Sequence, residues 1–269
     1  MTTFLLVPGL FMGGWAWSSV AAELKARGHR AVPLTLPGLD SGDAEQAEHA
    51  AQAEHAEDAR QPRDTGGAAA IGLTEHIEAV AAALAAEQGS VVLVAHSYGS
   101  FPAIAAAERL IDKVERVVFV DTGFPESGEA VTTTMPHLLG LAEGDVLAVP
   151  AGIDAVHGVP EEELARYRRL AAPQPFRTVT EPIELTGAWR ALPTTGIFCL
   201  ANGLNLELAR SLHATGAPRF AKLAEPGVTY AELNTGHYPM LSTPQELTEA
   251  LVQAAAGRGV DLWGKPVGC

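Results

Sequence analysis

The sequence predicts an α/β protein whose central sheet is mostly parallel and flanked by helices. Two short apolar segments, FLLV near the start and VVLVA at residues 91–95, are typical of strands that are buried on both faces. Each is followed by a loop and a helix-like stretch, which is the order of βα units. A chain of 269 residues, 47% of them hydrophobic, fits one large domain of this kind or two small ones.

The first βα unit occupies residues 3–35. Residues 3–7 are expected to form a strand, and the loop PGLFMGGWAW that follows is rich in glycine, so its backbone can bend closely around another group. Residues 18–27 are expected to form a helix that ends at Gly28. The next strand is expected at residues 30–35.

The segment AHSYG at residues 95–99 is the first candidate for chemistry. Ser97 lies between a strand and a helix, and the small residues Ala95 and Gly99 allow a sharp turn that exposes its hydroxyl. The N-terminus of the following helix favours an anionic intermediate at this place. The alternative is an ordinary strand–turn–helix in which the serine has no role.

Two later residues can complete a catalytic group with Ser97. Asp121 follows an apolar strand at residues 117–120, at the end that lines the ligand crevice of parallel sheets, and is either a catalytic acid or a turn cap. His237 lies in the loop after a strand expected at residues 228–233. The order serine, acid, histidine suits nucleophilic catalysis, in which His237 would deprotonate Ser97 and later protonate the leaving group.

Two segments depart from the βα rhythm. Residues 122–193 hold apolar, proline-punctuated loops with short helices and are expected to form a helical lid between core strands, leaving 1–121 and 194–269 as the core. Residues 41–70 form an acidic, low-complexity insertion with an imperfect QAEHA repeat. Its His49 and His55 are interpreted as part of a solvated segment, not as metal ligands.

Composition excludes several classes of partner. The net charge of −14 argues against nucleic acid and anionic membranes, and no run approaches the ~20 apolar residues of a membrane span. The first residues lack the features of a signal peptide, so we expect a cytoplasmic protein. Neither a metal nor an organic cofactor is expected, because HExxH, GxGxxG after a strand and clustered Cys/His are missing. A homodimer is left open.

Four segments carry a family resemblance. The GGW of the first loop, VDTGFPESG, AAPQPFRTVTEPIEL and TGHYPMLSTPQEL follow one another with a spacing that resembles the hydroxynitrile lyase/plant methylesterase-like group of α/β-hydrolases, including its bacterial members. The resemblance covers nearly the whole chain apart from residues 41–70. It implies the α/β-hydrolase fold, and it implies that the backbone N–H groups of Leu10 and Tyr98 form an oxyanion hole.

The chain departs from this group at two positions. The group begins the first loop with His-Gly, where this chain has Pro8 and Gly9, and it carries aspartate where this chain has Asn202. An asparagine can hold an imidazole but cannot neutralise an imidazolium. We therefore assign the acid to Asp121, one strand away, a position that some α/β-hydrolases use, and expect Asn202→Ala to change the rate little.

We expect a serine hydrolase that forms an acyl-enzyme on Ser97. Because the lid offers no arginine pair placed for a carboxylate or phosphate, the expected substrate is a neutral, moderately hydrophobic ester, thioester or lactone. One alternative is a lyase, elimination or cyclisation enzyme of small-molecule metabolism that uses Ser97 and His237 as acid and base. Cyanohydrin cleavage is not expected, because the lysine that hydroxynitrile lyases carry shortly after the histidine is missing from TGHYPML. A second alternative is a non-catalytic binding protein. The pocket is expected to be apolar and lined by Phe11, Trp17, Phe124, Leu138, Trp189 and Met240.

Overall fold

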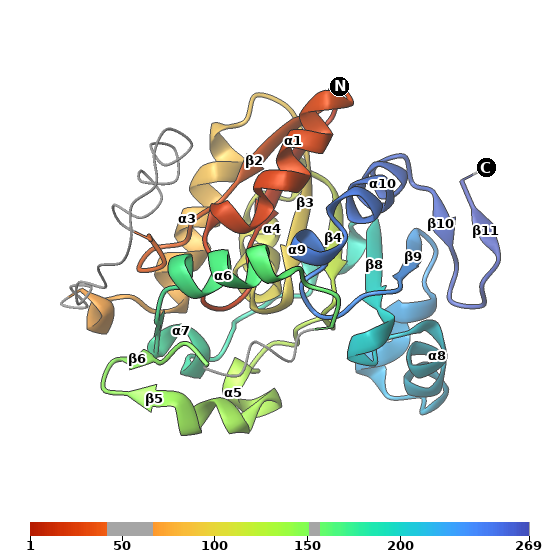
Figure 1. The fold of residues 1–269 in the computed structure, drawn as a ribbon. Helices are drawn as coiled ribbons and strands as arrows, with labels where there is room; N and C mark the ends of the chain where they lie inside the picture. Colours follow the sequence, from red (N-terminus) through yellow and green to blue (C-terminus); the bar gives the residue numbers. More distant parts are fainter. Residues whose placement is uncertain (42–66, 151–156, 269) are drawn as a thin grey trace.

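A central sheet organises the fold of the computed structural model, which describes residues 1–41, 67–150 and 157–268. Within these ranges the sheet has eight strands in the order β11-β10-β9-β8-β4-β3-β1-β2. Figure 1 labels all of them except β1. Their bounds are β1 (Thr3–Val7), β2 (Arg30–Pro33), β3 (Val91–His96), β4 (Val114–Val120), β8 (Thr194–Cys199), β9 (Val228–Leu233), β10 (Gly259–Val260) and β11 (Pro266–Val267). All pairs from β2 to β9 are parallel, and the short β10 and β11 are antiparallel. His49 and His55 lie outside the described residues.

The strand register brings the loops at the carboxyl ends together. Val7 of β1 pairs with Ala95 of β3, His96 pairs with Val120 of β4, and Val120 pairs with Ile197 of β8. Because parallel strands end at the same edge, the residues after β1, β3, β4 and β8 become neighbours. The β-branched, fully buried residues of β3 and β4 make these strands the centre of the core.

Helices cover the sheet in two packed pairs. Helix α1 packs against α10, and α3 packs against α4 (Figure 1). The helix bounds are α1 (Ser18–Ala26), α3 (Leu73–Ala86), α4 (Ser100–Arg109), α8 (Leu206–Ala214), α9 (Pro239–Ser242) and α10 (Pro244–Ala255). Among the described helices, none is both long and apolar enough to cross a membrane.

We call residues 122–193 the cap segment. Its described parts, 122–150 and 157–193, lie across one end of the sheet and run from yellow-green to blue-green in Figure 1. Besides helices, the segment contains a small antiparallel sheet, which the expectation of a helical lid did not include. Its described elements are α5 (Val131–Thr134), β5 (Ala142–Glu143), β6 (Val146–Leu147), α6 (Glu161–Leu170), β7 (Gln174–Pro175) and α7 (Arg177–Thr180).

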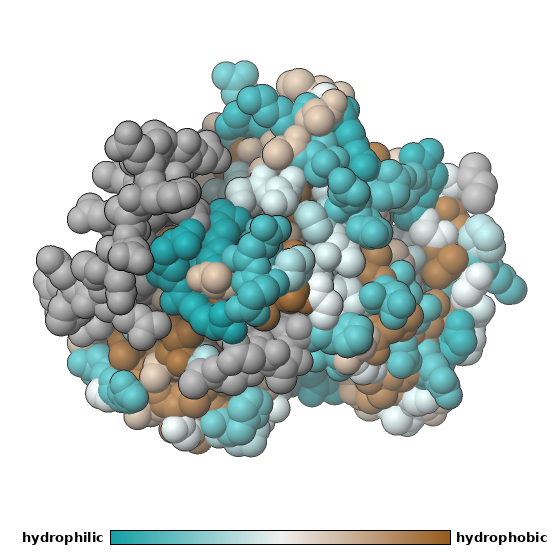
Figure 2. Space-filling model, in the orientation of Figure 1, coloured by the Kyte–Doolittle hydropathy of each residue, from teal (hydrophilic) through white to brown (hydrophobic). Residues whose placement is uncertain are grey.

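Helix α6 is amphipathic and fixes the cap segment to the core. Its outward face is hydrophilic in Figure 2, whereas Leu164, Tyr167 and Leu170 are buried. The Tyr167 ring lies 5.8 Å from the ring of Tyr238, between centroids, and Tyr238 directly follows His237. The helix therefore packs against the loop that carries His237.

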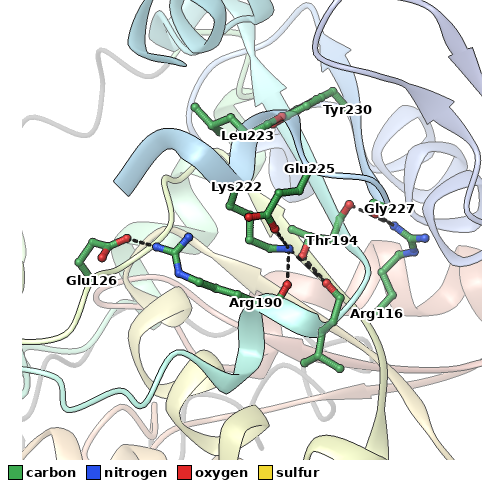
Figure 3. A network of polar contacts seen from close by, with 10 residues as sticks. Arg116, Glu126, Arg190, Thr194, Lys222, Leu223, Glu225, Gly227 and Tyr230 are labelled. Atoms are coloured by element: carbon green, nitrogen blue, oxygen red, sulfur yellow. Dashed lines mark hydrogen bonds and ion pairs between the residues drawn. The ribbon is translucent and has the colours of Figure 1, made fainter. Parts of the chain in front are cut away.

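A buried lysine stabilises the opposite, amino-terminal end of β8. Lys222 is 2% exposed, and its Nζ donates to the carbonyl of Arg190 at 2.7 Å and to that of Leu192 at 3.5 Å. Glu225 lies 3.5 Å away, beside the Arg190 carbonyl in Figure 3. The Trp189 ring centre lies 5.7 Å from the same Nζ. These contacts satisfy an ammonium group that would be costly to bury alone.

Candidate active site

Ser97 occupies a strained turn at the end of β3. Its backbone φ is +51°, a value that residues other than glycine rarely adopt. The turn continues as a 3-10 helix (Ser97–Gly99) into α4. A Cβ on Gly99 would lie 2.5 Å from the carbonyl oxygen of Pro8, so only glycine lets the first loop approach this closely. Ser97 itself is only partly buried, as the sharp turn predicts.

Ser97, His237 and Asp121 form a continuous hydrogen-bonded chain. His237 Nε2 lies 3.0 Å from Ser97 Oγ, and His237 Nδ1 lies 2.6 Å from Asp121 Oδ2. Because the carboxylate only accepts, Nδ1 carries the proton and Nε2 is free to accept the serine proton. Chemically, this arrangement can activate the hydroxyl as a nucleophile.

Asp121 is buried, and both oxygens of its carboxylate accept hydrogen bonds. It is 3% exposed, has a φ of +49°, and its Oδ1 accepts the backbone N–H of Cys199 at 3.0 Å. Burial raises the pKa of this carboxyl, but the hydrogen bond and charge of His237 and the Cys199 N–H lower it more. The resulting pKa lies below the ordinary value, so Asp121 is ionised at neutral pH.

Asn202 supports the acid and does not replace it. Its Nδ2 donates to Asp121 Oδ2 at 2.6 Å. The same Nδ2 lies 3.3 Å from His237 Nδ1, but both atoms carry protons in this arrangement and cannot bond to each other. The position where the resembling group has aspartate therefore holds a donor to the relocated carboxylate.

His96 lies beneath the catalytic loop as a neutral ring. Its Nε2 donates to the backbone carbonyl of His237 at 2.7 Å, and the two ring centroids are 4.7 Å apart. Burial, together with the nearby His237, lowers the pKa of His96 to about 3. Its Nδ1 faces Gly9, where a Cβ would come within 2.7 Å. Sequence reasoning missed this residue, although its place beside Ser97 was a signal.

The two expected oxyanion donors are the backbone amides of Leu10, in the loop after β1, and of Tyr98, the residue directly after Ser97. Within the described ranges, neither backbone N–H has a hydrogen-bond acceptor. The side chain of Tyr98 points into the core, where its hydroxyl donates to His76 Nδ1 at 2.7 Å. His76 Nε2 in turn donates to the carbonyl of Pro37 at 2.9 Å. Sequence reasoning placed His76 on a helix and did not find this contact.

Backbone strain is concentrated at this site. In the described part of the chain, the non-glycine residues with positive φ are Phe11 at +66°, Ser97 and Asp121. They follow three different strands, and each carries or adjoins a group of the site. Strained residues cost about 1–3 kcal/mol each and persist where the surrounding structure holds them, which is typical of functional sites.

Three of the expected pocket residues lie in the core of the structure, and their role as a pocket wall stays a prediction. Trp17, Trp189 and Met240 are at most 1% exposed. The Trp189 ring is enclosed by Phe119, Phe124 and Lys222, so its faces are used by the core. Trp17 packs edge-on against His96 behind the strand end, and Met240 points inward from α9. Large apolar side chains are more often core than pocket.

The other expected pocket residues are Phe11, Leu138 and Phe124. Phe11 and Leu138 are 4% and 5% exposed, and Phe124 is half-buried. Their role as a pocket wall stays a prediction. In the described ranges, no group of three or more His, Cys, Asp or Glu side chains is arranged to hold a metal ion.

Comparisons with known proteins identify the family of the chain. The model of a family described as the alpha/beta hydrolase family matches residues 4–250. The chain is 27% identical to a carbendazim hydrolyzing esterase of Nocardioides sp. (strain SG-4G), over 93% of this chain and 98% of that protein. It is 36% identical to esterase PIR7B of Oryza sativa subsp. japonica, over 94% of this chain and 95% of that protein.

Solved structures show the same fold. Tomato methylketone synthase I, complexed with 2-tridecanone, superposes with a TM-score of 0.68 at 18% identity, covering 94% of this chain and 97% of that one. A methylesterase of Arabidopsis, MES16, superposes with a TM-score of 0.67 at 16% identity, covering 94% and 98%. With a family model that spans most of the chain, the conclusion is plain: this chain belongs to the α/β-hydrolase family.

Proposed function

We propose that this enzyme is a serine ester hydrolase that works through an acyl-enzyme on Ser97. Ester hydrolysis as a class is supported by the esterases among its relatives. The observation that carries the mechanism is the chain of contacts at 3.0 Å and 2.6 Å that links Ser97 Oγ, His237 and Asp121.

The reaction proceeds in two halves. Ser97 Oγ attacks the acyl carbon while His237 Nε2 takes its proton, and the N–H groups of Leu10 and Tyr98 hydrogen-bond the oxyanion. His237 then protonates the leaving alkoxide, and the acyl group stays on Ser97. In the second half His237 deprotonates a water, which attacks the acyl carbon. His237 then returns its proton to Ser97 Oγ as the acid is released, which restores both residues. Asp121 keeps His237 in the required tautomer throughout.

A neutral, moderately hydrophobic substrate suits the surroundings of the site. The chain carries a net charge of −14, which disfavours anionic molecules. The ionised Asp121 adds a negative charge beside His237. Small esters, thioesters and lactones without a carboxylate or phosphate are therefore the proposed substrates.

The structure gives less support to the two alternatives, a lyase or cyclisation enzyme and a non-catalytic binding protein. A lyase or cyclisation enzyme was attractive because the group's usual acid position holds Asn202, and a proton shuttle needs less charge stabilisation than an acyl-enzyme. Asp121 at 2.6 Å from His237 supplies the missing charge. A non-catalytic role does not account for three strained residues that meet at one place.

An active-site probe tests the proposal. A fluorophosphonate should add to the wild-type protein once, as read by intact mass, and should not add to Ser97→Ala. His237→Ala should slow the labelling at least 100-fold, because the hydroxyl loses its base. A folded wild-type protein that forms no Ser97 adduct and hydrolyses no p-nitrophenyl ester would refute the serine-hydrolase mechanism.

A further inference from the structure

The side chain of Gln174, on β7 of the cap segment, holds the loop that follows β1. Gln174 is 0% exposed, and its Oε1 accepts the backbone N–H of Phe11 at 3.1 Å. Its Nε2 donates to Thr178 Oγ1 at 2.8 Å, and Thr178 Oγ1 donates to the carbonyl of Pro175 at 2.6 Å. The reversed amide would set its NH2 against the Phe11 N–H, so only one orientation satisfies every partner.

Phe11 is held at both of its backbone polar groups by the same part of the cap segment. While Gln174 accepts its N–H, its carbonyl accepts the N–H of Ala172 at 2.9 Å. These two bonds fix a residue whose φ of +66° is unfavourable for a phenylalanine. The strained turn directs the Phe11 amide into the core and leaves the amide of Leu10, one residue earlier, without a protein acceptor in the described ranges.

Pro8 and Gly9, at the start of this loop, have few groups that could hold it by hydrogen bonds. Pro8 has no N–H to donate, and Gly9 has no side chain that could form a hydrogen bond. The contacts of Gly9 with His96 and of Pro8 with Gly99 are steric. The directional bonds at Phe11 therefore come from the cap segment, more than 160 positions later in the chain.

We propose that Gln174 is a positioning residue for the oxyanion hole. By accepting the Phe11 N–H, it keeps the loop in the strained conformation in which the Leu10 N–H faces the oxygen of a tetrahedral intermediate on Ser97. The inference rests on the proposed ester hydrolysis and adds a residue that touches neither substrate nor nucleophile.

Two variants separate the bond to Phe11 from the rest of the network. Gln174→Met keeps the length of the side chain and removes the acceptor, whereas Thr178→Val removes the partner of Nε2 and leaves Oε1 in place. We expect Gln174→Met to lower kcat for p-nitrophenyl butyrate by about 10- to 100-fold with little change in KM, since loss of one oxyanion donor costs about 100- to 1,000-fold. Thr178→Val should stay within about threefold of wild type.

A conservative variant should restore part of the loss. A protonated glutamic acid at position 174 offers one acceptor and one donor, as the amide does. Gln174→Glu should therefore recover at least threefold over Gln174→Met. If Gln174→Met does not fold, Gln174→Asn replaces it, because it keeps the amide but is too short to reach Phe11.

Inhibitors distinguish positioning from general structural damage. A trifluoromethyl ketone forms a hemiketal oxyanion on serine, so its Ki should rise in Gln174→Met by about the factor by which kcat/KM falls. The corresponding alcohol forms no oxyanion, and its Ki should not change. Equal changes for both inhibitors, or an unchanged kcat, would overturn the proposal.

Hydrogen exchange tests the bond without catalysis. Peptides that cover residues 8–13 should exchange faster in Gln174→Met than in wild type or Thr178→Val. Unchanged exchange there would refute the role of Gln174 whatever the activity. If wild-type protein hydrolyses no ester, the proposed function fails, and this measurement alone decides on Gln174.

Discussion

Replacing Asp121 with asparagine tests the catalytic chain at the group that holds its charge. The carboxylate accepts three hydrogen bonds, from His237 Nδ1 and Asn202 Nδ2 on one oxygen and from the Cys199 N–H on the other. An asparagine has one acceptor and one donor end. Whichever way its amide turns, its NH2 meets a group that is itself a donor.

The size of the effect follows from the tautomer of His237. The amide oxygen is expected to keep the Cys199 N–H, so the NH2 faces His237 Nδ1 and forces the ring proton onto Nε2. A protonated Nε2 cannot take the proton of Ser97. Asp→Asn in a serine triad costs about four orders of magnitude, so we expect kcat to fall by about 1,000- to 10,000-fold, or about 4 to 5.5 kcal/mol in the barrier.

The assay is kcat for p-nitrophenyl butyrate, with thermal unfolding as a check that the variant is folded. Asn202→Ala is the matched control, because it removes one bond to the same oxygen but keeps the charge. The sequence suggested that this change would matter little, but the 2.6 Å contact predicts a loss of about 3- to 10-fold. An Asp121→Asn enzyme that keeps a tenth of the activity, still dependent on Ser97, would refute the assignment.

Exchanging the two residues sharpens the test. Asn202 Nδ2 is only 3.3 Å from His237 Nδ1, so an aspartate at position 202 can bring an oxygen near the imidazole. The double variant Asp121→Asn/Asn202→Asp should recover at least tenfold over Asp121→Asn alone. Recovery would show that either strand end can carry the charge, and its absence would mean that the backbone after β4 is also required.

Three further changes act on separate parts of the structure. Gly99→Ala places a Cβ 2.5 Å from the Pro8 carbonyl, so kcat should fall at least 100-fold, and near-normal activity would contradict the close approach. Burial lowers the pKa of His76 from 6.5 to about 4, so on acidification the unfolded chain takes up this proton first and stability is lost between these values. Urea unfolding measures the free energy of unfolding at pH 7 and at pH 4.5. The drop between these two pH values should be about 2–3 kcal/mol smaller in His76→Gln than in wild type. The same drop in both proteins would refute a neutral buried His76. Lys222→Met should lower the free energy of unfolding by about 1–3 kcal/mol and leave kcat unchanged, because its contacts lie at the far end of β8.

The fold and the polar residues at the strand ends could be predicted because short stretches of neighbouring residues identify both. The β-branched runs before Ser97 and Asp121 are long enough to identify buried strands. Parallel pairing then places their carboxyl ends side by side, so residue types and chain order suffice to bring serine, acid and histidine together. The extra residues of β4, from Val114, are a boundary difference of the usual kind.

The pocket and the supporting polar contacts could not be predicted from short sequence patterns. Whether Trp17 or Trp189 faces the core or a ligand depends on what packs on it, and composition alone cannot decide that. The bonds of Gln174 to Phe11 and of His76 to Tyr98 join residues 163 and 22 positions apart. One signal was present, since Gln174 is a polar residue within the otherwise apolar stretch AAPQPF.

The strain at the site explains why such distant contacts are needed. Phe11, Ser97 and Asp121 together cost about 3–9 kcal/mol if each left-handed residue costs 1–3, which is comparable to the whole stability of many domains. That cost is offset by bonds from elsewhere in the chain, such as Gln174 to Phe11 and Cys199 to Asp121. Part of what holds the strained backbone at Phe11 therefore comes from the cap segment, through the bonds of Gln174 and Ala172. An enzyme with residues 122–193 replaced by a short linker would keep the eight strands of the central sheet but lose the two bonds to the Phe11 backbone, one residue after Leu10.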